Sequence, residues 1–140
     1  SSLVGSEMCI RDSCSKLLAQ EPLLAMVSRE QGIPECRELT LEELAGHHLI
    51  LSKRYRKYIL SVFEKKGLSC DVYYECEDAR TAMAIAASGL GTAILPASMQ
   101  KQSENICALP IADKELATDV LLVWRNEEHS DVVESFIREF

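Results

Sequence analysis

Between residues 40 and 96, apolar stretches of strand length alternate with helices whose two ends are marked in the sequence. Thr40 and Glu43 have the spacing of a capping box at the start of the first helix. Asp78 is the predicted N-cap of the third helix, and a glycine follows each of the three helices as a stop signal. The predicted elements are, in order, helix Thr40–Gly46, strand His48–Ser52, helix Lys53–Gly67, strand Ser69–Glu77, helix Asp78–Gly89 and strand Gly91–Pro96.

The two longer helices are expected to pack against a sheet. The first is amphipathic, and five residues share one face of it: Tyr55, Tyr58, Ile59, Val62 and Phe63. The second is apolar on nearly every side, so we expect it to be buried. Strands that alternate with helices imply βαβ crossovers and a mainly parallel sheet. The sequence therefore predicts the α/β fold class.

The flanking segments add further strands. Leu17–Val27 is apolar but contains Pro22, which cannot donate to a central ladder, so it predicts a short strand, a break and a second strand. Gly32 and Pro34 make the following polar segment a loop. The remaining predicted elements are strands Asn105–Ile111 and Ala117–Arg125 and a closing helix, Ser130–Phe140.

The composition fits one domain or a fragment of a larger protein. The chain has 140 residues, of which 47% are hydrophobic and 26% charged. Its net charge of −7 argues against nucleic acid or an anionic membrane as a direct electrostatic partner of this chain. No C-x-x-C pair or zinc spacing occurs, which predicts reduced, mostly buried cytosolic thiols for the six cysteines: Cys9, Cys14, Cys36, Cys70, Cys76 and Cys107.

The first thirteen residues, SSLVGSEMCIRDS, follow neither a helical nor a strand period. They closely resemble the translation of a transposon-end sequencing adapter, and the alternative is a flexible native N-terminus. On the adapter interpretation, residues 1–13 are not native, and the natural chain begins near Cys14 as an N-terminally truncated fragment. We therefore expect this segment to be disordered or to make no meaningful contacts.

The turn LSKRYRK, Leu51–Lys57, is the first candidate site. Ligands of open α/β sheets bind beyond the carboxyl ends of the strands, where helix N-termini suit anions. Ser52 can cap the helix or donate to a ligand, and Tyr55 supplies a second hydroxyl. Lys53 and Arg54 are unfavourable for the helix dipole, so their presence indicates an anion to be held. A solvated basic face and a direct nucleic-acid contact are the alternatives.

The turn ECEDART, Glu75–Thr81, is the second candidate. Cys76 and Glu77 lie at a strand end where they could face the same cleft, whereas Asp78 is first of all an N-cap. The acidic residues here could be read as an acid/base cluster or a metal site, but neighbours on a strand point to alternate sides. The sequence therefore predicts no catalytic residue, no metal and no cofactor.

Two stretches, LILSKRYRKYILSVFEKKGL and YECEDARTAMAIAASGLGTAILPAS, resemble the effector-binding domain of LysR-type transcriptional regulators. The resemblance covers about residues 17–140. It implies a type 2 periplasmic-binding-protein fold, with two α/β subdomains joined by two crossing strands. About residues 22–117 would form a complete Rossmann-like second subdomain. Residues 118–140 would supply a crossing strand and the C-terminal helix of the first subdomain, and residues 14–140 together would be a fragment of the effector-binding domain.

The resemblance also implies a function. Ser52, Lys53, Arg54 and Tyr55 would line the effector cleft, with Cys76, Glu77 and Asp78 opposite or beside them. A small, often anionic metabolite would act allosterically on a cytoplasmic regulator that forms dimers or tetramers. DNA would be bound only through the missing N-terminal helix-turn-helix, and no membrane would be involved.

Two other function classes are weighed against the regulator. A transporter's solute-binding protein has the same fold, and its discriminator is a secretion signal. An enzyme on an α/β scaffold needs a nucleophile–base pair or a metal set, and the sequence offers neither. If the chain is a fragment, Phe136, Ile137 and Phe140 of the closing helix are expected to be partly exposed.

Overall fold

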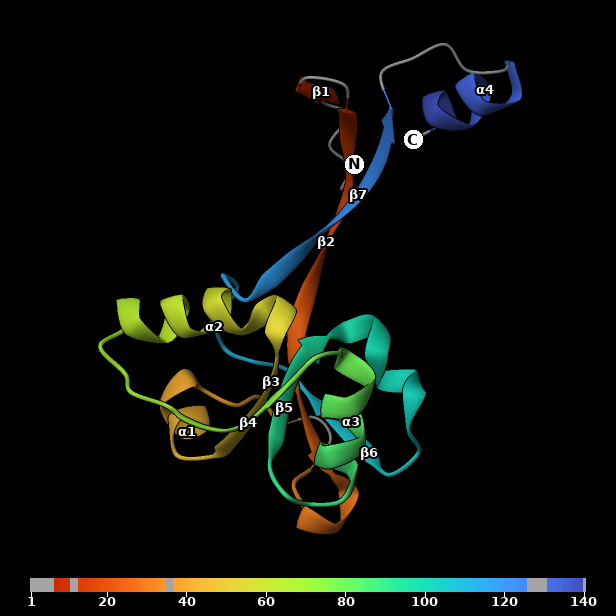
Figure 1. Ribbon diagram of the computed structural model, residues 1–140. Helices are drawn as coiled ribbons and strands as arrows, with labels where there is room; N and C mark the ends of the chain where they lie inside the picture. Colours follow the sequence, from red (N-terminus) through yellow and green to blue (C-terminus); the bar gives the residue numbers. More distant parts are fainter. Residues whose placement is uncertain (1–6, 11–12, 35–36, 126–130, 140) are drawn as a thin grey trace. The chain divides into compact units, whose positions relative to one another are not determined.

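The computed structural model describes residues 7–10, 13–34, 37–125 and 131–139 (Figure 1). The chain divides into two compact units, one of residues Pro22–Ala117 and one of Ser1–Glu21 with Thr118–Phe140. The elements, in order, are β1 Glu7–Ile10, β2 Ser13–Ser28, the 3-10 helix η1 Arg29–Gln31, α1 Leu41–Ala45, β3 His48–Ser52, α2 Lys53–Lys65, β4 Asp71–Cys76, α3 Ala79–Ala87, β5 Thr92–Pro96, the 3-10 helix η2 Ala97–Gln102, β6 Ile106–Leu109, β7 Ala117–Arg125 and α4 Asp131–Glu139.

The unit Pro22–Ala117 holds a mixed sheet with the strand order β6-β2-β5-β3-β4. β3 runs parallel to both β4 and β5, and α2 and α3 are the crossover helices between these three strands. β2 is antiparallel to β5 and β6, so the expectation of a mainly parallel sheet is wrong for these pairs. The crossover rule fixes direction only for strands joined by such helices. β2 leads through a loop and α1 to β3, which is not its neighbour.

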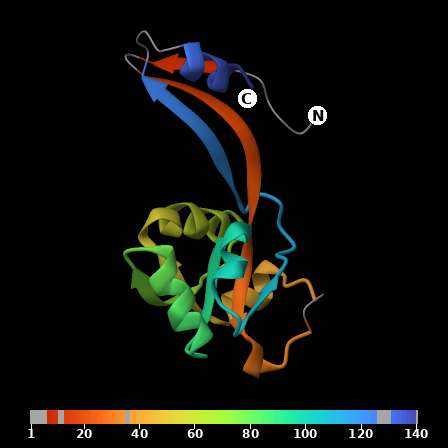
Figure 2. The ribbon, with the colours of Figure 1, turned by 90° about the vertical axis from the view of Figure 1, so that its right-hand side faces the viewer.

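Two apolar clusters cover the two faces of this sheet. Because successive strand residues point to opposite faces, Leu49 and Leu51 of β3 join a cluster with Phe63 of α2. Ile50 between them joins a second cluster with Met83 of α3. Figure 2 shows both helices beside the strands of this unit. The predicted amphipathic face of α2 is therefore buried in its Ile59, Val62 and Phe63 positions, whereas Tyr58 is exposed.

The helix α3 differs from its prediction. Ala82, Met83 and Ala86 are buried, but Arg80 and Ala84 are exposed, so α3 is buried on one face rather than all round. The reason is composition, because the exposed residues of α3 are the polar Arg80 and Thr81 and the small Ala84, which all tolerate water. Both predicted ends are confirmed, with Asp78 as N-cap and Gly89 in the left-handed region at φ 85°.

β2 is one continuous strand, which corrects the predicted break at Pro22. Pro22 begins the unit Pro22–Ala117, at the point where the partners of β2 change. Leu23 pairs with Pro96 of β5 and donates its N–H to the Leu116 carbonyl (N···O 2.9 Å). A proline is tolerated at such a position because no ladder bond with β5 needs its missing N–H.

The described part of the N-terminal segment is ordered, which contradicts the expectation that residues 1–13 make no meaningful contacts. β1 pairs antiparallel with the start of β2, and the register places Cys9 opposite Cys14. Their Cα atoms are 4.0 Å apart and a disulfide joins them, so these two cysteines are not reduced thiols. Cys70, Cys76 and Cys107 are free, and Cys36 lies outside the described residues.

The closing helix α4 matches its predicted position but not every predicted exposure. Phe136 is exposed, as are Val132 and Val133, whereas Ile137 is buried with only 6% of its surface exposed. The prediction of partial exposure is therefore wrong for Ile137, because the amphipathic spacing of α4 turns one side of the helix inward. Phe140 lies outside the described residues.

Candidate functional site

Two strand-to-helix turns lie side by side at the carboxyl edge of the sheet. β3 ends at Ser52 and β4 ends at Cys76, and these two residues are Cα partners in the parallel ladder. α2 begins directly after Ser52, and α3 begins after Asp78. The sequence-predicted residues of both turns are therefore neighbours, as the carboxyl ends of adjacent parallel strands must be.

Ser52 is the most informative residue of the site. It is the N-cap residue of α2 and only 1% exposed, yet its side chain makes no capping bond. Its Oγ is buried and has no hydrogen-bond partner among the residues that the structure describes. A buried hydroxyl without a partner costs about 1–3 kcal/mol. The unpaired Ser52 hydroxyl, at a helix N-terminus with its own unpaired N–H groups, suits an acceptor from outside the chain.

The cations of the first turn are exposed and partly engaged. Lys53 Nζ lies 3.5 Å from Glu77 Oε1, which joins the two turns by an ion pair. The Arg54 guanidinium carbon lies 5.6 Å from the centre of the Tyr55 ring, a distance at which a cation–π contact holds. Lys53 and Arg54 are therefore exposed at the start of α2, whereas Tyr55 is half-buried and packs against the cluster that contains Phe63.

The second turn is structurally satisfied. Asp78 Oδ1 accepts the Thr81 N–H at 2.8 Å, and this bond lowers the pKa of the Asp78 carboxyl below 3.8. Burial, and then the Asp78 charge, raise the pKa of the Cys76 thiol, so the thiol is protonated at neutral pH. Asp78 is thus a helix cap, and Cys76 is a neutral buried group beside Ser52. Glu77 acts on the first turn only through its ion pair with Lys53.

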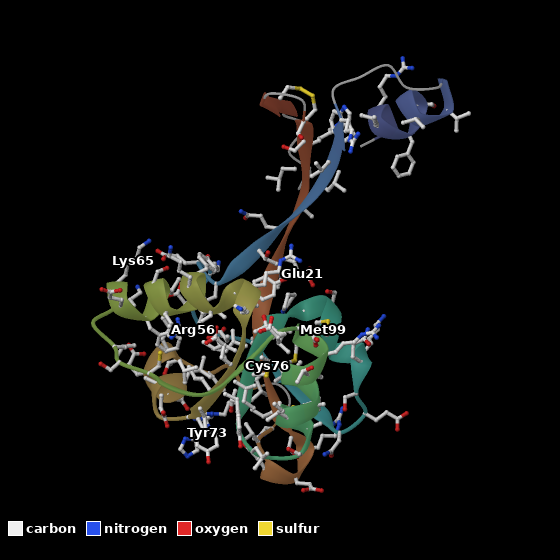
Figure 3. All side chains as sticks on the ribbon, in the orientation of Figure 1. Glu21, Arg56, Lys65, Tyr73, Cys76 and Met99 are labelled. Carbon is white, nitrogen blue, oxygen red and sulfur yellow. A yellow bond between two sulfur atoms is a disulfide. The ribbon has the colours of Figure 1, made fainter. Side chains whose placement is uncertain are left out.

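Arg56 is a neighbour of the site that the sequence analysis missed. Its Nε lies 3.5 Å from Glu75 Oε2, close enough for an ion pair, but it is buried and has no hydrogen-bond partner among the described residues. Figure 3 marks Arg56 on α2 and Cys76 at the end of β4. The signal was its spacing: Arg56 lies three residues after Lys53, on the same side of the helix.

Two further features are absent from the described residues. No group of three or more His, Cys, Asp or Glu side chains is placed to hold a metal ion within the described ranges. Likewise, no helix in the described part of the chain is long and apolar enough to cross a membrane.

Comparison with known proteins identifies the family. Residues 11–140 match the LysR substrate binding domain. The chain belongs to this family. Its relatives include the transcriptional regulator CatR of Pseudomonas putida, 27% identical over 125 residues, and BenM of Acinetobacter baylyi, 24% identical over 127 residues. The alignments cover 85% of this chain and 43% and 42% of those two proteins, so the chain spans less than half the length of these curated relatives.

Solved structures confirm the fold. The LysR family regulator CbnR superposes with a TM-score of 0.80 at 22% identity, over 96% of this chain and 50% of CbnR. The BenM effector-binding domain with its effector benzoate superposes with a TM-score of 0.76 at 23% identity, over 95% of this chain and 66% of that chain. The LysR substrate-binding domain thus has the periplasmic-binding-protein-like α/β fold that the sequence predicted. LysR-type regulators are not enzymes.

Proposed function

We propose that this chain is the effector-binding domain of a bacterial LysR-type transcriptional regulator, and that its β3–α2 turn holds the anionic group of a small effector. The observation that carries the proposal is the buried, unpaired hydroxyl of Ser52 at the start of α2. The first N–H groups of α2 and the nearby charges of Lys53 and Arg54 favour an anion there. The family match favours a regulator over a transporter's solute-binding protein.

The seven residues take different roles in this proposal. Ser52 donates to the effector, Lys53 and Arg54 attract it, and Tyr55 and Cys76 shape the contact surface. Glu77 competes with the effector for Lys53, and Asp78 holds the N-terminus of α3 in place. Benzoate, the effector in the BenM structure, is a carboxylate, which agrees with an anionic ligand for this chain.

The roles of the other parts of the regulator are proposed from membership of the family alone. The unit Pro22–Ala117 would be the second subdomain of the effector-binding domain, and the segment Thr118–Phe140 would belong to the first. Effector binding would act allosterically on a cytoplasmic dimer or tetramer, and DNA would be bound through a helix-turn-helix outside this chain. We retain the proposal that residues 1–13 are not native. Residues 1–10 lie outside the family match.

The test is a titration of the isotopically labelled 140-residue chain, followed by amide NMR. Benzoate and a panel of small carboxylates are each compared with the corresponding neutral amide. We expect an acid, but not its amide, to shift the backbone signals of Ser52 to Tyr55 saturably. Ser52→Ala and Arg54→Gln should each weaken binding about tenfold, which is the loss of one charge-assisted contact.

Lys57→Gln is the matched control, because it removes an exposed cation from the next turn of α2 and should change the affinity less than twofold. Two results would contradict the site: acids that shift other signals but leave those of the β3–α2 turn unchanged, or a loss of affinity in Lys57→Gln equal to that in Arg54→Gln.

Sequencing the gene upstream of codon 14 tests the regulator assignment separately. A reading frame without a helix-turn-helix upstream of codon 14 would contradict it.

A further inference from the structure

Ser52 and Cys76 lie next to each other on one face of the sheet. They are Cα partners in the parallel ladder of β3 and β4, and such partners present their side chains to the same face. Both are buried, since Ser52 is 1% exposed and Cys76 is 6% exposed. Figure 3 labels Cys76 at the end of β4. The unpaired Ser52 hydroxyl therefore has a thiol as its neighbour on the adjacent strand.

The surroundings of Ser52 on this face are apolar. Ile50 lies two residues earlier on β3, so it points to the same face, and it belongs with Cys76 to one buried cluster. The helix α3 contributes Ala82 and Met83 to that cluster. None of these four side chains is a strong hydrogen-bond donor or acceptor. This explains why the Ser52 Oγ has no hydrogen-bond partner among the described residues.

Cys76 is an uncharged and weakly polar neighbour. Burial raises the pKa of its thiol, so no thiolate repels a bound anion at neutral pH. The charge of Asp78 acts on the thiol in the same direction. The Asp78 carboxylate is exposed, however, and its Oδ1 already accepts the Thr81 N–H. A ligand group that lies against Cys76 therefore meets sulfur and carbon rather than a hydrogen-bonding partner.

We propose that Cys76 makes the β3–α2 turn specific for carboxylates that carry no hydroxyl or amino group on the carbon next to the carboxylate. The inference rests on the proposed function, since it takes a carboxylate as the group that Ser52 binds. The adjoining carbon would then lie against Cys76, where a hydroxyl or ammonium group would lose water without gaining a partner. Apolar walls reject an added hydroxyl only moderately, so we expect a loss of affinity of about tenfold. 2-Hydroxy acids and 2-amino acids are therefore poor ligands.

The test is amide NMR of the labelled 140-residue chain with two matched pairs of acids, propanoate with lactate and phenylacetate with mandelate. The members of a pair differ by one hydroxyl, both are ionised at neutral pH, and both enantiomers of each hydroxy acid are used. We expect each hydroxy acid to bind about tenfold more weakly than its parent acid, as followed by the signals of Ser52 to Tyr55. Equal affinities, or tighter binding of the hydroxy acids, would overturn the inference.

Cys76→Ser should remove this preference, because a hydroxyl in place of the thiol can donate to the ligand hydroxyl and accept from it. The ratio of the two Kd values should fall from about ten to below about two. Cys76→Ala is the matched control, because it enlarges the space without adding a hydrogen-bonding group and should keep the ratio within about twofold of the parent chain. If Cys76→Ala removes the preference as fully as Cys76→Ser, size rather than hydrogen bonding decides, and the inference fails.

The failure of the proposed function has a different outcome. If neither propanoate nor phenylacetate shifts the signals of Ser52 to Tyr55, the turn does not bind a carboxylate, and the proposed function falls together with the specificity. If all four acids bind there without preference, the proposed function stands and the role of Cys76 is refuted. The ratio of two affinities measured on one protein does not depend on its folded fraction, so a destabilised variant still gives a result.

Discussion

The two helices that begin at the carboxyl edge of the sheet, α2 and α3, differ in whether a side chain caps their N-terminus. α3 is capped by its own side chain, because Asp78 accepts the Thr81 N–H at 2.8 Å. α2 begins at Ser52, also an N-cap residue with extended backbone, but its side chain makes no such bond. The strands before them are hydrogen-bonded neighbours, so the two helices begin at the same edge of the sheet but differ in their capping.

This contrast separates a structural helix start from one available to a ligand. A satisfied cap stabilises its helix and occupies an N–H group that a ligand could otherwise use. An unsatisfied buried hydroxyl costs stability, and such a cost persists at sites where function needs the group. The two turns therefore make opposite predictions for stability and for binding.

The largest effect is expected from removing the anchor of α2. Phe63 is fully buried in the cluster that holds α2 against β3, so Phe63→Ala should lower the free energy of unfolding by about 3–5 kcal/mol. Tyr58→Ala is the control on the same helix, since Tyr58 is 40% exposed and should cost much less. Urea unfolding followed by circular dichroism measures both. Equal losses would mean that α2 is not seated by its buried face.

The next largest loss of stability is expected from removing the N-cap of α3. Asp78→Ala removes the acceptor of the Thr81 N–H and should lower the melting temperature by a few degrees, while Asp78→Asn should retain most of the stability. Thermal unfolding of the three proteins in one buffer is the measurement. If Asp78→Ala melts with the parent chain, the cap is not stabilising and the comparison of the two turns fails.

The same carboxylate predicts a dependence on acid. Its folded pKa lies below the ordinary 3.8, so its contribution is fully present above about pH 4 and is lost as the pH falls through the folded value. The parent chain should therefore lose more stability than Asp78→Ala in the acid range. Denaturant unfolding at a series of pH values tests this, and parallel curves for the two proteins would contradict it.

Ser52→Ala should not lower the free energy of unfolding, in contrast to Asp78→Ala. Removing an unpaired buried hydroxyl should leave the unfolding free energy unchanged or raise it by up to about 1 kcal/mol. The matched control is Ser28→Ala: Ser28 is equally buried, but its Oγ accepts the Glu30 N–H, so its loss should cost about 1 kcal/mol. Denaturant unfolding compares them. Destabilisation by Ser52→Ala equal to that by Ser28→Ala would remove the main support for an effector at this turn.

Local signals in the sequence were sufficient for most elements of the sheet and its helices. The capping box was legible because both of its bonds join residues three apart, Thr40 and Glu43. The direction of β2 and the Cys9–Cys14 pairing could not be predicted from local signals, because each depends on which strands become neighbours. Serine at a helix start predicts a cap, so the missing bond of Ser52 was visible only in the folded chain.

The smallest effect concerns the ion pair that joins the two turns. The Lys53 and Glu77 side chains are 66% and 84% exposed, so a double-mutant cycle should give a coupling of at most about 0.5 kcal/mol.

The same ion pair should have a larger effect on anion binding. If the β3–α2 turn holds an anion, Glu77→Gln removes the competing carboxylate from Lys53 and should strengthen anion binding about two- to threefold at low salt, whereas Lys53→Gln should weaken it. Glu64→Gln, which removes a carboxylate near the far end of α2, is the control for net charge. An equal gain from Glu64→Gln would show that the effect is long-range, and no gain from Glu77→Gln would mean that Lys53 does not face the ligand.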